Sequence, residues 1–145
     1  ELSIIKLAER SATFPMNLTN QGFQELVDSM LIRHQSILDI LSKGQEASCR
    51  VNRAVVKAVT TCGCITINAQ KPTIPENTTL ADLKYLFSSH LNGKLCPNCR
   101  ETVEMELGNQ MFYITALVNT LGLSLNGILE KEVERLNTLT VYNLK

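Results

Sequence analysis

Two closely spaced cysteine pairs are the residues of this chain best suited to chemistry. Cys62 and Cys64 are separated by a single glycine, and Cys96 and Cys99 by a Pro-Asn dipeptide. Four thiolates that converge from two such pairs form the usual tetrahedral structural zinc site. The intervening segment 65–95 is longer than the inner spacing of zinc ribbons, which is roughly 15–20 residues. The zinc interpretation therefore requires that neighbouring elements bring both pairs to one place.

Helices are the elements predicted to do this. Apolar residues at steps of three and four predict a helix over 45–62, which ends at the first pair. Pro97 suits a first helical turn and predicts a long helix over 97–121, which begins at the second pair. If these helices pack antiparallel, all four sulfurs meet at the same end. The connector 65–78 contains two prolines and is predicted to be irregular.

Three interpretations without zinc stay open. The Cys96–Cys99 pair also resembles a redox-active dithiol, although that chemistry usually lies at the strand-to-helix turn of a βαβ unit. The thiols could instead be buried as small hydrophobic groups, or form a structural disulfide. Cys49 has no partner in sequence and is expected in the core. His90 lies near the second pair and could replace one sulfur as a ligand.

The remaining pattern predicts an all-α helical bundle in a single domain, 1–145, with an N-terminal arm over 1–20. Apolar spacing predicts a helix over 22–43 that Gly44 ends. A short helix capped by Thr79 is expected to continue to Leu91 and to pack its leucines and Phe87. A last helix is predicted over 124–137.

Composition excludes several classes of partner. The chain has 145 residues, and its 14 basic and 14 acidic residues give a net charge of zero. A neutral chain has no electrostatic preference for nucleic acid or for an anionic membrane. No apolar run approaches the roughly 20 residues needed to span a bilayer, and the first residues do not resemble a signal peptide. A cytoplasmic protein is the expectation.

The predicted long helix is apolar on more than one side. Its apolar positions are Val103, Met105, Leu107, Phe112, Tyr113, Ile114, Ala116, Leu117, Val118 and Leu121. A helix that is hydrophobic nearly all round must be covered nearly all round. We therefore expect a homodimer; the alternative is a monomer whose N-terminal segment covers the second face.

The string Glu106-Leu107-Gly108-Asn109, the aromatic run that follows and the Leu-Gly turn at Gly122 resemble the MazG-like all-α nucleoside triphosphate pyrophosphohydrolases. The resemblance implies two carboxylate pairs on facing helices, at a spacing that puts both acids of a pair on one face. In that family they hold Mg²⁺, which activates water for cleavage between the α and β phosphates.

The chain departs from that family pattern in two places. Asn109 replaces one carboxylate, and the facing helix has no acid after Glu46. That helix instead carries Arg50, Arg53 and Lys57, which would either form ion pairs with the acids of the long helix or face solvent. Either way the four-acid Mg²⁺ site is incomplete, which makes the metal-site motif degenerate.

Three functional hypotheses follow. The first is a MazG-like protein with lost or altered pyrophosphohydrolase activity, which acts as a zinc-stabilised binding or interaction module for a nucleotide or protein partner. The second is an active Mg²⁺-dependent hydrolase that uses Glu101, Glu104 and Glu106 together with acids such as Glu130 or Glu134. The third is a nucleotide-binding protein without hydrolysis, in which Arg50, Arg53 and Lys57 hold the phosphates as charge-assisted donors.

Overall fold

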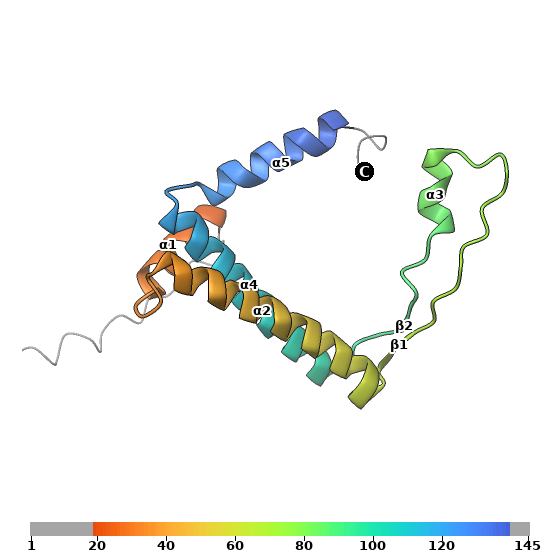
Figure 1. Ribbon diagram of the computed structural model, residues 1–145, viewed down its shortest axis with the longest axis horizontal. Helices are drawn as coiled ribbons and strands as arrows, with labels where there is room; N and C mark the ends of the chain where they lie inside the picture. Colours follow the sequence, from red (N-terminus) through yellow and green to blue (C-terminus); the bar gives the residue numbers. More distant parts are fainter. Residues whose placement is uncertain (1–18, 140–145) are drawn as a thin grey trace, which may run out of the picture.

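The computed structural model describes residues 19–139, so the predicted N-terminal arm lies outside them except for its last two residues. The described chain is mainly helical (Figure 1). Its helices are α1 (Asn20–Met30), α2 (Ile37–Lys57), a π-helical turn η2 (Ala58–Cys62), α3 (Leu80–Leu86), α4 (Pro97–Thr120) and α5 (Leu125–Leu139). Strands β1 (Ile65–Ile67) and β2 (Leu91–Gly93) form a small antiparallel sheet, which the sequence analysis did not predict.

The body of the molecule is the antiparallel pair of α2 and α4 (Figure 1). Ala47 and Ala54 are buried on one stripe of α2, where small side chains let the two helices approach. Gly44 lies inside α2, and a Cβ atom placed on it would be 3.8 Å from the Cβ of Tyr113 on α4. The prediction that Gly44 ends a helix is wrong, because α2 continues through Gly44 where it packs against α4.

The predicted continuous helix over 22–43 is also wrong, because the chain leaves the helical conformation between α1 and α2. The carbonyl of Ser36 accepts a hydrogen bond from the N–H of Ile40 at 2.9 Å and starts α2 anew. The break lets Val27 of α1 and Ile40 of α2 share one buried core with Ala116 of α4. Apolar spacing could not reveal it, because both halves keep helical periodicity.

Residues 65–95 form an arm that leaves and returns at the same end of the α2/α4 pair (Figure 1). At its base Ile65 is buried and pairs with Gly93 across the sheet. At its far end the predicted cap is confirmed: Thr79 and the carboxylate of Asp82 form a capping box at the start of α3. The connector is therefore a strand followed by an irregular segment.

The predicted extent and packing of this short helix are wrong. The hydroxyls of Ser88 and Ser89 accept the N–H groups of His90 and Leu91, in place of helical carbonyls. His90 has a φ of 57°, and Leu91 lies in β2. None of the α3 side chains is buried, so the expected packing of its leucines and Phe87 does not occur within the described chain.

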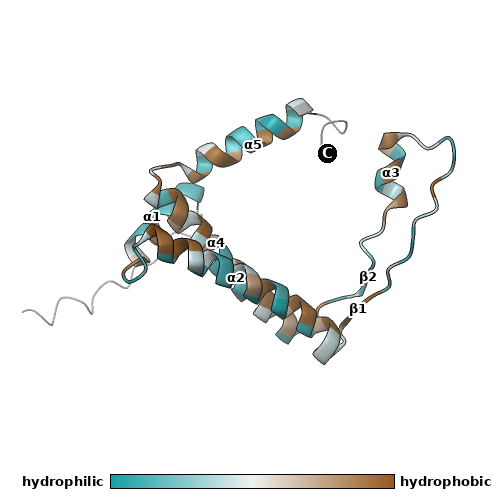
Figure 2. Ribbon diagram, in the orientation of Figure 1, coloured by the Kyte–Doolittle hydropathy of each residue, from teal (hydrophilic) through white to brown (hydrophobic). Residues whose placement is uncertain are grey.

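Helices α4 and α5 leave apolar surface uncovered. Apolar and polar residues alternate along α5 (Figure 2), and Met105, Met111 and Ile114 are exposed on α4. Of the predicted apolar face of α4, Val103, Ala116 and Val118 are buried. Among the described residues no single helix is long and apolar enough to cross a membrane; α4 and α5 meet that criterion only together, across a bend of 103°.

Candidate metal centre

The end of α2 positions the first cysteine pair. The last turn widens into the π-helical segment η2, and the N–H of Gly63 donates to the carbonyl of Ala58 at 2.9 Å. Gly63 adopts a left-handed φ of 73°, which glycine tolerates without strain, and it turns the chain back over the helix end. Cys62 and Cys64, on either side of this glycine, are therefore presented at the same end of the helix.

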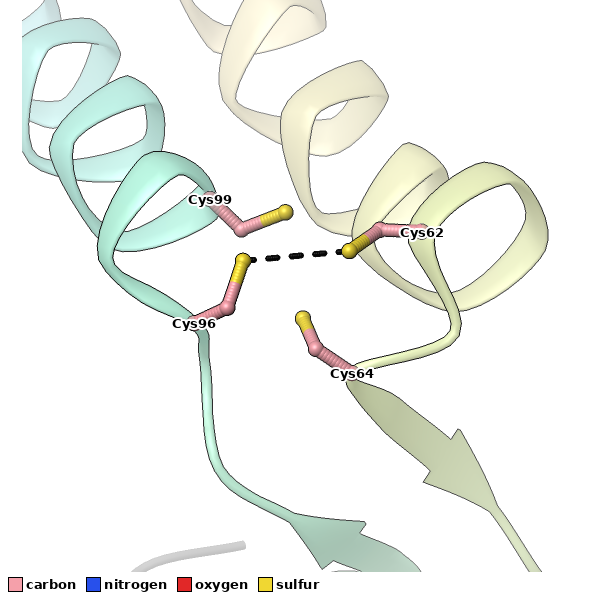
Figure 3. Close-up of side chains that lie close together, drawn as sticks. All are labelled: Cys62, Cys64, Cys96 and Cys99. Carbon is pink, nitrogen blue, oxygen red and sulfur yellow. Dashed lines mark hydrogen bonds between the residues drawn. The ribbon is translucent and has the colours of Figure 1, made fainter.

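The start of α4 positions the second pair. Cys96 is the N-cap residue, Pro97 occupies the first helical turn, and Cys99 lies one turn further along. The carbonyl of Cys96 accepts the N–H of Arg100 at 2.9 Å, which fixes the beginning of the helix. The two sulfurs of this pair therefore point from one helix terminus toward the end of α2 (Figure 3).

The four sulfur atoms form one cluster, as predicted. Cys62, Cys64, Cys96 and Cys99 place their Sγ atoms within 4.8 Å of one another, and those of Cys62 and Cys96 are 3.7 Å apart (Figure 3). A tetrahedral zinc site with Zn–S bonds of about 2.3 Å has sulfur–sulfur edges of about 3.8 Å. A disulfide needs about 2.05 Å, and all the cysteines are free thiols. The spacing thus fits a cluster that could hold a metal ion.

The thiols of the cluster perturb one another's pKa. The N–H of Cys99 donates to Cys96 and lowers the pKa of the Cys96 thiol from 9.0 to about 7. Its hydrogen bond with Cys96 raises the pKa of Cys99 to about 12. Cys99 lowers the pKa of Cys62, but the hydrogen bonds with Cys96 and Cys64 outweigh this and raise it. Four thiolates therefore need a cation to replace the protons, which is the role of a bound metal.

The small sheet holds Cys64 in register with the second pair. A Cβ atom placed on Gly93 would lie 2.6 Å from the carbonyl oxygen of Cys64, so only glycine permits the observed approach of β2. The thiol of Cys64 also lies 3.8 Å from the carbonyl of Ala58, which is fully buried. The roles of Ala58, Gly63 and Gly93 in this site were not predicted from the sequence. The position of Gly63 between two cysteines, and of Gly93 in an Asn-Gly turn pair, are the signals that could have indicated the glycines.

Two other predictions about ligands and cysteines are wrong. His90 does not join the cluster; it lies in the arm beyond the sheet, where its backbone carbonyl accepts the N–H of Asn68. Cys49 is exposed rather than buried, because Ala47 and Ala54 occupy the inner stripe of α2. Neither residue belongs to the group of side chains close enough to hold one metal ion.

The candidate catalytic acids lie along α4 and do not gather into a site. Glu101 and Glu104 are exposed, and Glu104 lies 3.9 Å from Arg100 of the same helix. Glu106 is half-buried and faces the part of α2 that carries Arg50. Among the described residues, the cysteine cluster is the only group of three or more potential ligands close enough to hold a metal ion.

The basic stripe of α2 faces solvent, one of the two predicted outcomes. Arg50, Arg53 and Lys57 are all exposed. Arg50 donates to Glu46 of the same helix, and this hydrogen bond, with a smaller contribution from Glu106, raises its pKa. Lys43 and Arg50 together lower the pKa of Glu46 to about 2. The stripe therefore forms no ion pair with α4 among the described residues.

Comparisons of the chain with models of known protein families, with curated proteins and with solved structures gave no match. The site is therefore described from its geometry alone. It is a cluster of four cysteines, two at the end of one helix and two at the start of another.

Proposed function

We propose that the cluster binds a structural zinc ion through Cys62, Cys64, Cys96 and Cys99. Soft thiolate ligands select zinc or an iron–sulfur cluster over Mg²⁺ and Ca²⁺, and four thiolates in a closed tetrahedron are typical of structural zinc. The observation that carries this proposal is the convergence of the four sulfurs within 4.8 Å. Zinc there would supply no chemistry of its own and would fix the base of the arm to the α2/α4 pair.

We further propose that the protein acts as an interaction module stabilised by this zinc. The arm carries exposed apolar side chains, among them Ile74, Tyr85 and Phe87, with Tyr85 85% exposed. No other element of the described chain packs closely on α3. Side chains of this kind, held on a fixed base, suit a protein partner.

A relationship to the MazG-like pyrophosphohydrolases, with hydrolysis lost or altered, is part of this proposal. Its support is the continuation of α4 through the turn at Gly122 into α5, and the position of Glu106 on the side of α4 that faces α2. A second carboxylate pair would have to stand on α2 near Glu106, where α2 carries Arg50. A cation there opposes the binding of Mg²⁺ beside Glu106.

The zinc proposal is tested by metal analysis of the full chain purified without chelator. We expect about one zinc per chain, a value reduced by Cys99→Ser and unchanged by Cys49→Ser, which alters an exposed cysteine outside the cluster. Protein that contains no zinc and whose thiols all titrate freely would overturn the proposal, as would iron in place of zinc.

Pyrophosphate release across a panel of nucleotides, with Mg²⁺ or Mn²⁺, tests the loss of hydrolysis. We expect background rates. Robust turnover that Glu106→Gln abolishes would instead establish the active hydrolase. Nucleotide binding that persists in chelator and is lost on Arg53→Gln with Lys57→Gln would establish a nucleotide-binding protein.

A further inference from the structure

Helix α5 presents an amphipathic surface that the rest of the described chain leaves uncovered. It follows a bend of 103° after α4 and projects away from the α2/α4 pair (Figure 1). It is attached by its first turn, where the side-chain oxygen of Gln24 accepts the N–H of Leu125 at 2.8 Å. Beyond that turn Leu129, Val133 and Leu136 are exposed along one side. An isolated helix of this length is marginal in water, so α5 requires a surface to pack against.

The charges beside this stripe have a counterpart of opposite sign on α2. Both helices carry a charge, a valine and a second charge at positions i, i+3 and i+4, which share one helical face. The acidic triplet is Glu130, Val133 and Glu134 on α5, and the basic triplet is Arg53, Val56 and Lys57 on α2. The two valines are 57% and 56% exposed. Among the described residues, no ion pair uses any of the four charged side chains.

The two triplets of one chain lie apart. The main contacts of α5 are with α1, at the end of α4 opposite the cysteine cluster. The basic triplet lies in the half of α2 that leads to the cluster (Figure 1). A second copy carries both triplets, and a two-fold axis forms both contacts at once. We propose that a second copy of this chain docks the acidic triplet of its α5 on the basic triplet of α2, and receives the first chain's α5 in return.

The matching charges and apolar side chains have separate roles in this contact. Exposed ion pairs contribute only about 0–1 kcal/mol each, so burial of the stripe at Leu129, Val133 and Leu136 supplies most of the affinity. The charges select the partner surface and its orientation, because a shifted register places like charges together. Surface charges are screened by salt, so dimerisation weakens as salt rises.

Charge reversal tests the proposal on the full chain, with mass measured by sedimentation velocity over a range of concentrations. One variant carries Glu130→Lys and Glu134→Lys, and a second carries Arg53→Glu and Lys57→Glu. Each reversed variant should dimerise at least tenfold more weakly than the wild-type chain. An equimolar mixture of the two should form a heterodimer, because each α5 then meets an α2 of opposite charge. A single chain that carries all four changes should dimerise again.

The matched control carries Glu25→Lys and Asp28→Lys on α1, which are exposed and change the net charge by the same amount as the acidic-triplet variant. It should dimerise like the wild-type chain. Helix content by circular dichroism checks folding, and Glu130→Gln with Glu134→Gln replaces the reversed variant if that fails to fold. Three outcomes would each overturn the proposal. The wild-type chain could remain monomeric at high concentration, or its dimer could be unaffected by either reversal. The wild-type chain could also float with phosphatidylcholine vesicles in place of forming a dimer.

Discussion

Replacement of Gly93 by alanine tests whether the small sheet positions Cys64 for metal binding. The new Cβ atom would lie 2.6 Å from the carbonyl oxygen of Cys64. A relaxed contact needs about 3.4 Å, so the backbone beside Cys64 must move by roughly 0.8 Å. Zn–S bonds lie within about 0.2 Å of 2.3 Å, so a shift of this size passed on to the Cys64 sulfur should weaken zinc binding at least tenfold, or by about 1.4 kcal/mol.

Backbone strain must be separated from this displacement, and Gly122 offers the matched control. Gly93 and Gly122 have φ values of 87° and 66°, so alanine at either position costs roughly 1–2 kcal/mol of conformational strain. A Cβ atom on Gly122 meets no atom within 4 Å, and this glycine lies at the opposite end of α4 from the cluster. Both variants should lose stability, and only Gly93→Ala should lose zinc affinity.

The assay is competition for zinc between the folded chain and a chromophoric chelator, followed by urea unfolding of each zinc-loaded variant. Wild-type zinc affinity in Gly93→Ala would refute the positioning role of the sheet. An equal loss of affinity in Gly122→Ala would show that general destabilisation, rather than displacement of Cys64, controls the site.

Three further changes have defined outcomes. Cys62→Ser removes one proposed zinc ligand and should lower the melting temperature of the zinc-loaded chain by several degrees, whereas Cys49→Ser should leave it unchanged in the same thermal scan. The pKa of Glu46 is lowered from 4.5 to about 2, so the contribution of Glu46 to stability is present above pH 4.5 and is lost as the pH falls toward 2. In urea titrations at pH 5 and pH 2.5, Glu46→Gln should therefore lose less stability between the two pH values than the wild-type chain. Gly44→Ala should raise the free energy of unfolding by about 0.5–1 kcal/mol, because alanine favours the helix and its Cβ would make an ordinary 3.8 Å contact with Tyr113; a decrease would show that α2 and α4 cannot admit a methyl group.

The metal cluster could be predicted because its signals are local. The apolar periodicity of the first helix ends at Cys62, and Pro97 opens the second helix, so each cysteine pair is assigned to a helix end. Because both pairs lie at helix ends, they meet if the two helices pack antiparallel. The extent of α4 was predicted to within one residue for the same reason.

The errors concern features that depend on contacts between distant residues. Gly44 is a helix stop signal in sequence, and only the packing of α2 against Tyr113 of α4 shows that the helix continues through it. The pairing of Ile65 with Gly93 joins the two ends of the arm, and neither strand has a run long enough to show alternation. The outward position of Cys49 likewise depends on which stripe of α2 meets α4.

The cluster takes its sulfurs from two helix ends that are distant in sequence, and this makes metal concentration a thermodynamic variable of the fold. A metal that binds all four sulfurs binds only the state in which α2 and α4 are paired, so its binding free energy adds to the stability of that pair. At a free metal concentration one hundred times the dissociation constant, this linkage contributes about 2.7 kcal/mol. Each tenfold fall in free metal below that level removes up to about 1.4 kcal/mol, and the pairing of the two long helices weakens with it.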